Sequence, residues 1–238
     1  MLKQIPGQIF LADQREVKYT TQFRRYSTFN LGEPVNFDKE SFGSLYVFNE
    51  EQIASSQKIT FSVEEDSYIV LFPITGAASF TDPEGNTIYV DVEEVLISQI
   101  PAGLLYMIAN PYEKEPISFL QFWIKAATPL YTVISQITSF RLDSVQNQLT
   151  RLPVEETVQE LPFSVSLGRF NGRSEALYTL KKQQGLHFFA FVIAGAFEVE
   201  GRLLHEKDGL GLWETEEVEL EALSNNALIL TLELFGCN

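Results

Sequence analysis

Histidine and cysteine are scarce in this sequence, and their scarcity excludes much of the usual active-site chemistry. The 238 residues contain two histidines, His187 and His205, and one cysteine, Cys237. A single cysteine cannot form an intrachain disulfide, and its place beside the C-terminus predicts an exposed thiol without a function. No other cluster of metal-ligating side chains lies near either histidine in the sequence. We therefore expect His187 to be structural or at the surface, and His205 to lie in a solvent-exposed hairpin.

Basic residues and long apolar runs are also few. The chain has 32 acidic and 17 basic residues, a formal net charge of −15, which repels nucleic acid and anionic membranes. The pairs at Arg24 and Lys181 are too small to form a basic patch. No apolar stretch approaches the roughly 18 residues that a membrane span needs, and the first residues lack a signal-peptide core. We expect a cytoplasmic monomer with no nucleic-acid or membrane partner.

Short apolar runs separated by turn residues make up most of the chain. They are rich in Val, Ile and Phe and are interrupted by Gly, Asp, Asn and Pro, a pattern typical of antiparallel strands in a sandwich or barrel. Helical periodicity is nearly absent. Hydrophobic residues make up 45% of the chain, enough to give each of two domains its own core.

One strand pattern occurs twice, around two Gly-Ala pairs. YIVLFPIT runs into the pair at Gly76, and HFFAFVIA runs into the pair at Gly195. A spacing of roughly one hundred residues indicates two domains, since solenoid repeats have periods of about 20–50 residues. We predict an N-terminal domain at residues 1–130, a connector at 131–160 and a C-terminal domain at 161–238. The connector shows neither clean alternation nor a helical stripe.

A series of short landmarks lies in a fixed order along both halves. The first half contains YSTFN, FGSLYVFNEE, GAASFTDPEGN, PAG, NP and FLQFWI, and the second contains VSLGRF, the IAG turn, the EVEGRLL hairpin, KDG and VELEAL. Over almost the whole chain this order resembles the pirin family, which includes quercetin 2,3-dioxygenase-like bicupins. The resemblance implies an all-β fold of two tandem cupin barrels, each a double-stranded β-helix of jelly-roll type.

The resemblance also implies one metal ion, usually iron, in the N-terminal barrel. A His-x-His pair on one strand and a His-x-Glu pair on a later strand would bind it, because residues two apart on a strand face the same side. Counted back from GAASFTDPEGN without a gap, the first pair falls on Ser62 and Glu64. The second pair, between PAG and NP, falls on Tyr106 and Ile108. None of the four is histidine, so we expect no metal and no other cofactor.

A barrel without a metal can still bind a ligand. The family position near the metal on the last strand matches Gln121, so that Ser62, Glu64, Tyr106, Ile108 and Gln121 would line a candidate pocket. The same side chains would equally well fill the interior, since small barrels are commonly packed solid. The sequence leaves both interpretations open.

Two functions remain. The favoured one is a pirin-like bicupin that has lost its metal site and acts as a non-catalytic protein, with a small molecule in the N-terminal barrel or a protein partner. The alternative is a cupin enzyme, either a quercetin 2,3-dioxygenase-like oxidoreductase or a metal-independent isomerase or lyase, that uses residues around Glu64. Metal analysis of the purified protein separates the two.

Overall fold

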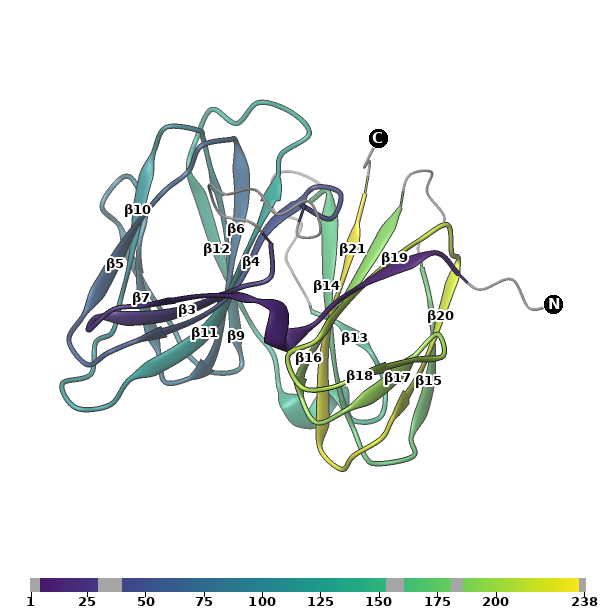
Figure 1. Ribbon diagram of the computed structural model, residues 1–238. Helices are drawn as coiled ribbons and strands as arrows, with labels where there is room; N and C mark the ends of the chain where they lie inside the picture. Colours follow the sequence, from purple (N-terminus) through teal and green to yellow (C-terminus); the bar gives the residue numbers. More distant parts are fainter. Residues whose placement is uncertain (1–4, 30–39, 153–160, 181–185, 236–238) are drawn as a thin grey trace. The chain divides into compact units, whose positions relative to one another are not determined.

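The computed structural model describes residues 5–29, 40–152, 161–180 and 186–235, which are almost entirely β (Figure 1). They form two compact units. The N-terminal unit is Arg15–Ser139, and the C-terminal unit joins Met1–Gln14 to Phe140–Asn238. The expected all-β fold of two cupin-type barrels is thereby confirmed. Cys237 lies outside the described residues. Within the described residues, no helix is long and apolar enough to cross a membrane.

Among the described residues, the strands of the N-terminal unit form a seven-stranded and a four-stranded antiparallel sheet. The larger sheet has the order β12-β9-β6-β11-β4-β3-β2, and the smaller has the order β5-β10-β7-β8. The strands are β2 (Glu16–Tyr19), β3 (Phe23–Ser27), β4 (Leu45–Ile53), β5 (Lys58–Ser62), β6 (Ser67–Thr75), β7 (Ala78–Thr81), β8 (Thr87–Val90), β9 (Glu94–Ile100), β10 (Leu105–Ala109), β11 (Ile117–Lys125) and β12 (Ile134–Ser139).

The C-terminal unit repeats this plan, with a six-stranded sheet in the order β1-β19-β16-β21-β14-β13 and a four-stranded sheet in the order β15-β20-β17-β18 among the residues described. Its strands are β1 (Gly7–Phe10), β13 (Thr150–Arg151), β14 (Phe163–Phe170), β15 (Glu175–Thr179), β16 (His187–Ala194), β17 (Phe197–Val199), β18 (Arg202–Leu204), β19 (Gly209–Trp213), β20 (Glu217–Ala222) and β21 (Ala227–Leu234), with the 3-10 turns η1 (Ala12–Gln14) and η3 (Leu142–Val145).

Alternation of apolar and polar residues places one face of each sheet in a core. In β20, Val218 and Leu220 are buried while the glutamates between them face solvent. The two central strands, β6 and β16, end at Gly76 and Gly195, whose φ angles are +72° and +79°. An L-residue rarely adopts such angles, so glycine is required at both turns. The two Gly-Ala pairs therefore occupy corresponding places in the two barrels.

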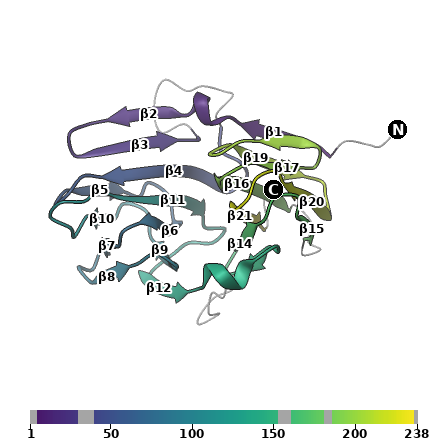
Figure 2. The same ribbon diagram turned by 90° about the horizontal axis from the view of Figure 1, so that it is seen from below.

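The compact units differ from the expected boundaries at two segments. β1 lies within residues 1–130 but pairs with β19 of the C-terminal unit, from Gly7 opposite Leu212 to Phe10 opposite Gly209 (Figure 2). β12, within the expected connector, pairs with β9 at the edge of the N-terminal sheet. A pairing across about two hundred residues leaves no local sequence pattern, and an edge strand that is only half-buried lacks clean alternation.

Candidate functional site

The register of β5 against β10 decides which side chains face the interior of the N-terminal barrel. Tyr106 lies directly opposite Phe61, and Ile108 lies opposite Ile59. Residues opposite one another in an antiparallel pair share a face, so Phe61 points the same way as Tyr106. Both belong to the buried core cluster of the unit, and so does Val63.

Ser62 and Glu64 lie on the other side and are exposed. Their expected interior placement is therefore wrong by one residue. The count back from GAASFTDPEGN allowed no gap, but it passes through the turn between β5, which ends at Ser62, and β6, which begins at Ser67. The turn between the two strands interrupts the alternation, and the interior positions fall on Phe61 and Val63 instead.

Tyr106, Ile108 and Gln121 do face the interior, where each is at least 98% buried. The interior positions at or beside those where the resemblance places metal ligands are thus occupied by Phe61, Val63, Tyr106 and Ile108. Only Tyr106 carries an atom able to bind a metal, and burial raises the pKa of its phenol well above 10, an effect that the nearby Glu51 carboxylate reinforces. A neutral phenol is a poor ligand for a transition metal. This donor set does not fit the iron-type site that the resemblance implies.

Aromatic side chains fill the space between these positions. The Phe61 and Tyr106 rings stack with centroids 5.1 Å apart, and Phe80 and Trp123 lie 5.3 and 6.0 Å from the Tyr106 ring. Such contacts resemble the close packing of an ordinary core. Among the described residues, no three His, Cys, Asp or Glu side chains come together as a metal site would require.

A polar cluster nevertheless faces the same interior, with four members on the larger sheet and Tyr106 on the smaller one. Its members are Arg25 of β3, Asn49 and Glu51 of β4, Tyr106 of β10 and Gln121 of β11. Arg25 Nε donates to Glu51 Oε1 at 2.5 Å, and Asn49 Nδ2 donates to the same oxygen at 3.4 Å. The Arg25 guanidinium lies 5.2 Å from the centroid of the Phe61 ring. We refer to these five residues as the polar cluster.

Burial governs the electrostatics of Glu51. Its side chain is fully buried, and burial raises the pKa of its carboxyl from 4.5 to about 7, although the Arg25 guanidinium beside it acts to lower the pKa. A carboxylate transferred from water into a low-dielectric interior loses more solvation free energy than one ion-pair partner restores. Glu51 therefore changes its charge near neutral pH, where the polar cluster alternates between an ion pair and a lone guanidinium.

Gln121 joins the cluster through Tyr106, to whose hydroxyl its Nε2 donates a hydrogen bond. It also lies directly opposite Asn49 in the β11–β4 pair. Three acceptor oxygens of the cluster have no hydrogen-bond donor: Asn49 Oδ1, Glu51 Oε2 and Gln121 Oε1. Buried polar atoms without partners are rare in proteins, and three in one place call for an explanation.

Gln121 and Tyr106 were expected in the interior from the sequence, whereas Arg25, Asn49 and Glu51 were not. A signal was present in β4, where Asn49 and Glu51 stand at alternate positions between the apolar Val47 and Ile53. Polar residues at interior positions of a strand indicate a buried polar site. Arg25 could not be linked to Glu51 in this way, because the β3–β4 register that brings them together is a tertiary feature.

The interior of the C-terminal barrel also contains polar side chains, but these are well partnered. The Tyr178 hydroxyl donates to Glu233 Oε1 at 2.5 Å, and Ser164 Oγ donates to the same atom at 3.3 Å. Burial is the main cause that raises the pKa of Tyr178 to about 12, and this hydrogen bond acts in the same direction. The hydroxyl therefore keeps its proton and stabilises the carboxylate, as expected for a structural network.

The two histidines lie away from both interiors. His205 is exposed in the turn before β19, as expected, and its backbone N–H donates to Asp208 Oδ2. His187 begins β16 on the face opposite to the interior residues Phe188 and Ala190, and it is half-buried. Neither histidine lies in a group of three or more potential metal ligands among the described residues.

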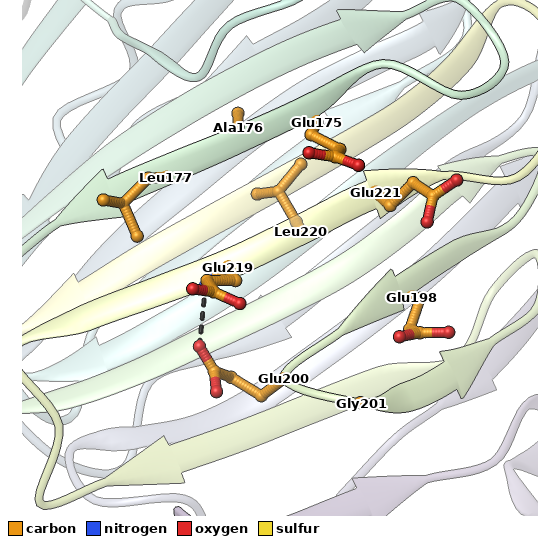
Figure 3. A pocket seen from close by; sticks show the side chains of 9 residues that line it. All are labelled: Glu175, Ala176, Leu177, Glu198, Glu200, Gly201, Glu219, Leu220 and Glu221. Atoms are coloured by element: carbon orange, nitrogen blue, oxygen red, sulfur yellow. Dashed lines mark hydrogen bonds between the residues drawn. The ribbon is translucent and has the colours of Figure 1, made fainter.

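The C-terminal unit also has a surface groove of about 450 Å³ (Figure 3). It lies over the outer face of β15, β20 and β17, where glutamates stand at alternate positions along the strands. Glu200 Oε1 accepts the backbone N–H of Glu219 at 2.6 Å. Carboxylates exposed in this way are satisfied by water and counterions. The glutamates that line the groove are Glu175, Glu198, Glu200, Glu219 and Glu221.

Comparisons with known proteins agree with this architecture. The family model of the quercetinase C-terminal cupin domain matches residues 162–234. Quercetin 2,3-dioxygenase of Escherichia coli (strain K12) is 22% identical over 216 residues, which cover 86% of this chain and 89% of the relative. A putative quercetin 2,3-dioxygenase of Mycobacterium tuberculosis is 23% identical over 202 residues, covering 80% of this chain and 79% of the relative.

Solved structures share the fold along nearly the whole chain. The crystal structure of YhhW from E. coli gives a TM-score of 0.81 at 16% identity and covers 96% of this chain and 97% of that one. The same bacterial pirin in complex with nickel(II) gives a TM-score of 0.78, also at 16% identity, over 96% and 99% of the two chains. The chain thus contains a quercetinase-type C-terminal cupin domain, and over most of its length it is similar to the pirin-like bicupins.

Proposed function

We propose that this pirin-like bicupin has lost the metal site of its N-terminal barrel and works as a non-catalytic binding protein. The proposal rests mainly on one observation: the interior positions of β5 and β10 carry Phe61, Val63, Tyr106 and Ile108. A first-row transition metal prefers imidazole and carboxylate ligands, and these positions supply neither. The neighbouring polar cluster supplies hydrogen-bonding groups in their place.

The related bacterial pirin provides the contrast that supports this proposal. Its crystal structure is a complex with nickel(II), so a protein of this fold can hold a metal ion. In the present chain, the interior positions at or beside the expected metal ligands carry the stacked rings of Phe61 and Tyr106 and the aliphatic side chains of Val63 and Ile108. A shared fold does not carry the function of its relatives, because function depends on the residues of the site.

A dioxygenase is the second candidate, because curated relatives of similar length are named quercetin 2,3-dioxygenases. The version of this hypothesis that relied on Glu64 is weakened, since Glu64 is exposed on the outer side of the barrel. An enzyme would have to use the polar cluster instead. The names of the relatives are the observation that favours this candidate, and identities of 22–23% leave room for a change of function.

Metal loading tests the proposal directly. The full chain, purified without chelator, is incubated with Ni(II), Fe(II), Mn(II) or Cu(II), desalted and analysed for metals, with E. coli pirin YhhW as the positive control. We expect far less than one ion per chain for this protein and about one for the control. Oxygen uptake with quercetin should be absent with or without added metal. Stoichiometric metal, or metal-dependent oxygen uptake, would show that the protein is a cupin enzyme.

A further inference from the structure

Strand β2 forms one edge of the larger N-terminal sheet. It pairs with β3 on one side, and on its other side it has no partner strand among the described residues (Figure 2). All four residues of β2 are exposed, and the exposed fractions of Val17 and Tyr19 are 55% and 69%. The outer N–H and C=O groups of an edge strand form a template on which another strand can pair.

The hydrogen bonds of the β2–β3 hairpin show which backbone groups of β2 point away from it. The Thr20 N–H donates to the Phe23 carbonyl at 2.9 Å, so the pair that closes the turn is hydrogen-bonded. Hydrogen-bonded and non-hydrogen-bonded pairs alternate along an antiparallel ladder. Tyr19 and Val17 therefore occupy non-hydrogen-bonded positions against β3. Their N–H and C=O groups point outwards, towards the place of a further strand.

The side chains of β2 are complementary in charge to those of a second β2 strand. Glu16 and Lys18 lie on either side of Val17 and share one face of the strand. When two β2 strands run antiparallel with Val17 opposite Val17, each Glu16 lies opposite a Lys18. These are non-hydrogen-bonded pairs, in which side chains are closest and opposite charges stabilise the pairing. The edge of β2 therefore fits a second copy of itself.

The register about Val17 is the one that satisfies both the hydrogen bonds and the charges, among registers centred on a residue of β2. The two Val17 residues exchange both backbone hydrogen bonds, because their outward groups face each other. A register centred on Glu16 or Lys18 would bring inward-pointing groups and like charges together. A register centred on Tyr19 would match the hydrogen bonds but place Glu16 and Lys18 opposite uncharged residues.

We propose that the outer edge of β2 is an interface between two copies of this chain, which pair their β2 strands antiparallel about Val17. The larger N-terminal sheets of the two copies then form one continuous sheet. A lysine on an edge strand often prevents such pairing, but here each Lys18 meets a Glu16 carboxylate of the other copy. Four residues from each copy make a small interface, so the dimer is weak. The inference is independent of the proposed function, because β2 contributes no residue to the interior positions of β5 and β10.

Reversal of one charge at a time tests this interface in the full chain. Glu16→Lys places lysine opposite lysine at both pairs of the dimer, and Lys18→Glu places glutamate opposite glutamate. A mixture of the two variants restores two pairs of opposite charge. By sedimentation equilibrium we expect concentration-dependent dimers of the parent protein and a dissociation constant at least about tenfold higher for each variant alone. The mixture should form dimers as the parent does.

Two further variants control for the backbone and for net charge. Val17→Pro removes an outward-pointing N–H that the hairpin does not use, and proline is tolerated at such positions of edge strands. It should abolish the dimer, and it is the second variant in case a charge variant does not fold. Lys58→Glu on β5, at the edge of the smaller sheet, makes the same charge change elsewhere and should leave the dimer unchanged. Thermal unfolding checks that each variant is folded.

Several outcomes would overturn the inference. A parent protein that stays monomeric at every concentration would do so, and so would a dimer that neither charge variant weakens, since another surface would then hold it. A mixture that dimerises no better than its two components would contradict the pairing of Glu16 with Lys18. Equal weakening by Lys58→Glu would indicate a general effect of the net charge of −15 and not a contact at β2.

Discussion

Arg25 and Glu51 face each other on β3 and β4 and form an ion pair, Nε to Oε1 at 2.5 Å, inside the N-terminal barrel. The carboxylate is fully buried, while the guanidinium packs against the rings of Phe23 and Phe61. A buried pair of this kind adds little to stability, because desolvation offsets the attraction between its members. It does make the barrel sensitive to pH, since burial prevails and raises the pKa of Glu51 to about 7.

The first prediction concerns stability between pH 4.5 and 7. Because the pKa of Glu51 is about 7 in the folded state and 4.5 in the unfolded state, the folded protein holds a proton that the unfolded chain releases in this window. The free energy of unfolding should therefore fall as pH rises through the window and reach its lower level above pH 7. The loss attributable to Glu51 is about 3 kcal/mol at most.

Denaturant unfolding of the N-terminal barrel at several pH values measures this loss, and Glu51→Gln is the control. The glutamine has nearly the same shape and does not titrate. The charged or polar groups around Glu51 are Arg25, Lys18, Asn49 and Tyr106. If the variant keeps the full pH dependence of the parent, Glu51 is not its source.

The second prediction is that Glu64→Gln will have no effect. Glu64 is exposed, so its carboxylate is solvated by water whether or not the barrel holds a ligand. We expect a change in the free energy of unfolding within about 0.5 kcal/mol. Thermal unfolding of the variant and the parent protein measures this change. A clear change in stability would indicate that the Glu64 side chain lies in the interior, as the first register had placed it.

The fold could be predicted from the sequence, whereas the site could be predicted only in part. Strand alternation and the turns at Gly76 and Gly195 are local signals, and they led to the correct architecture. The predicted positions of the metal ligands depend on a count through the turn between β5 and β6. An error of one residue in that count moves a side chain to the other face of the strand. The partnership of Arg25 with Glu51 depends on strand pairing alone, so no local pattern reveals it.

The third prediction uses the corrected register to rebuild a metal site. Phe61→His and Val63→His, combined with Tyr106→His and Ile108→Glu, place three imidazoles and a carboxylate on the interior face. We expect this variant to bind about one Ni(II) per chain. The control carries the same changes on β10 but has Ser62→His and Glu64→His on β5. Its new imidazoles would project from the exposed face, so we expect it to bind nickel much more weakly.

Elemental analysis and thermal unfolding with and without nickel measure the result. Polar residues in a core destabilise it, so the rebuilt variant can depend on nickel for folding, and that dependence is itself a sign of a specific site. Equal nickel binding by the rebuilt variant and its control would contradict the register. Nickel binding by the parent protein would instead contradict the proposed loss of the metal site.

The last prediction concerns the turn at Gly195, where the two barrels correspond. Its φ of +79° is unfavourable for other residues, and a Cβ would overlap Ser224 Oγ and come within 3.0 Å of the Ala227 Cβ. Ser224 Oγ accepts the backbone N–H of Ala196 at 3.1 Å, so a displaced Ser224 would lose this hydrogen bond as well. We expect Gly195→Val to destabilise the C-terminal unit by an amount of order 1–3 kcal/mol.

Gly201→Ala in the same unit is the matched control. Gly201 also has a positive φ, +68°, but a Cβ there meets nothing within 4 Å. A comparison of Gly195→Ala with Gly201→Ala therefore separates steric overlap from backbone strain. Both variants should have backbone strain, but only Gly195→Ala should also have steric overlap. Denaturant unfolding followed by Trp213 fluorescence reports on this unit. If the two alanine variants lose the same stability, backbone strain alone explains the glycine, and the close approach of Ser224 and Ala227 does not constrain the turn.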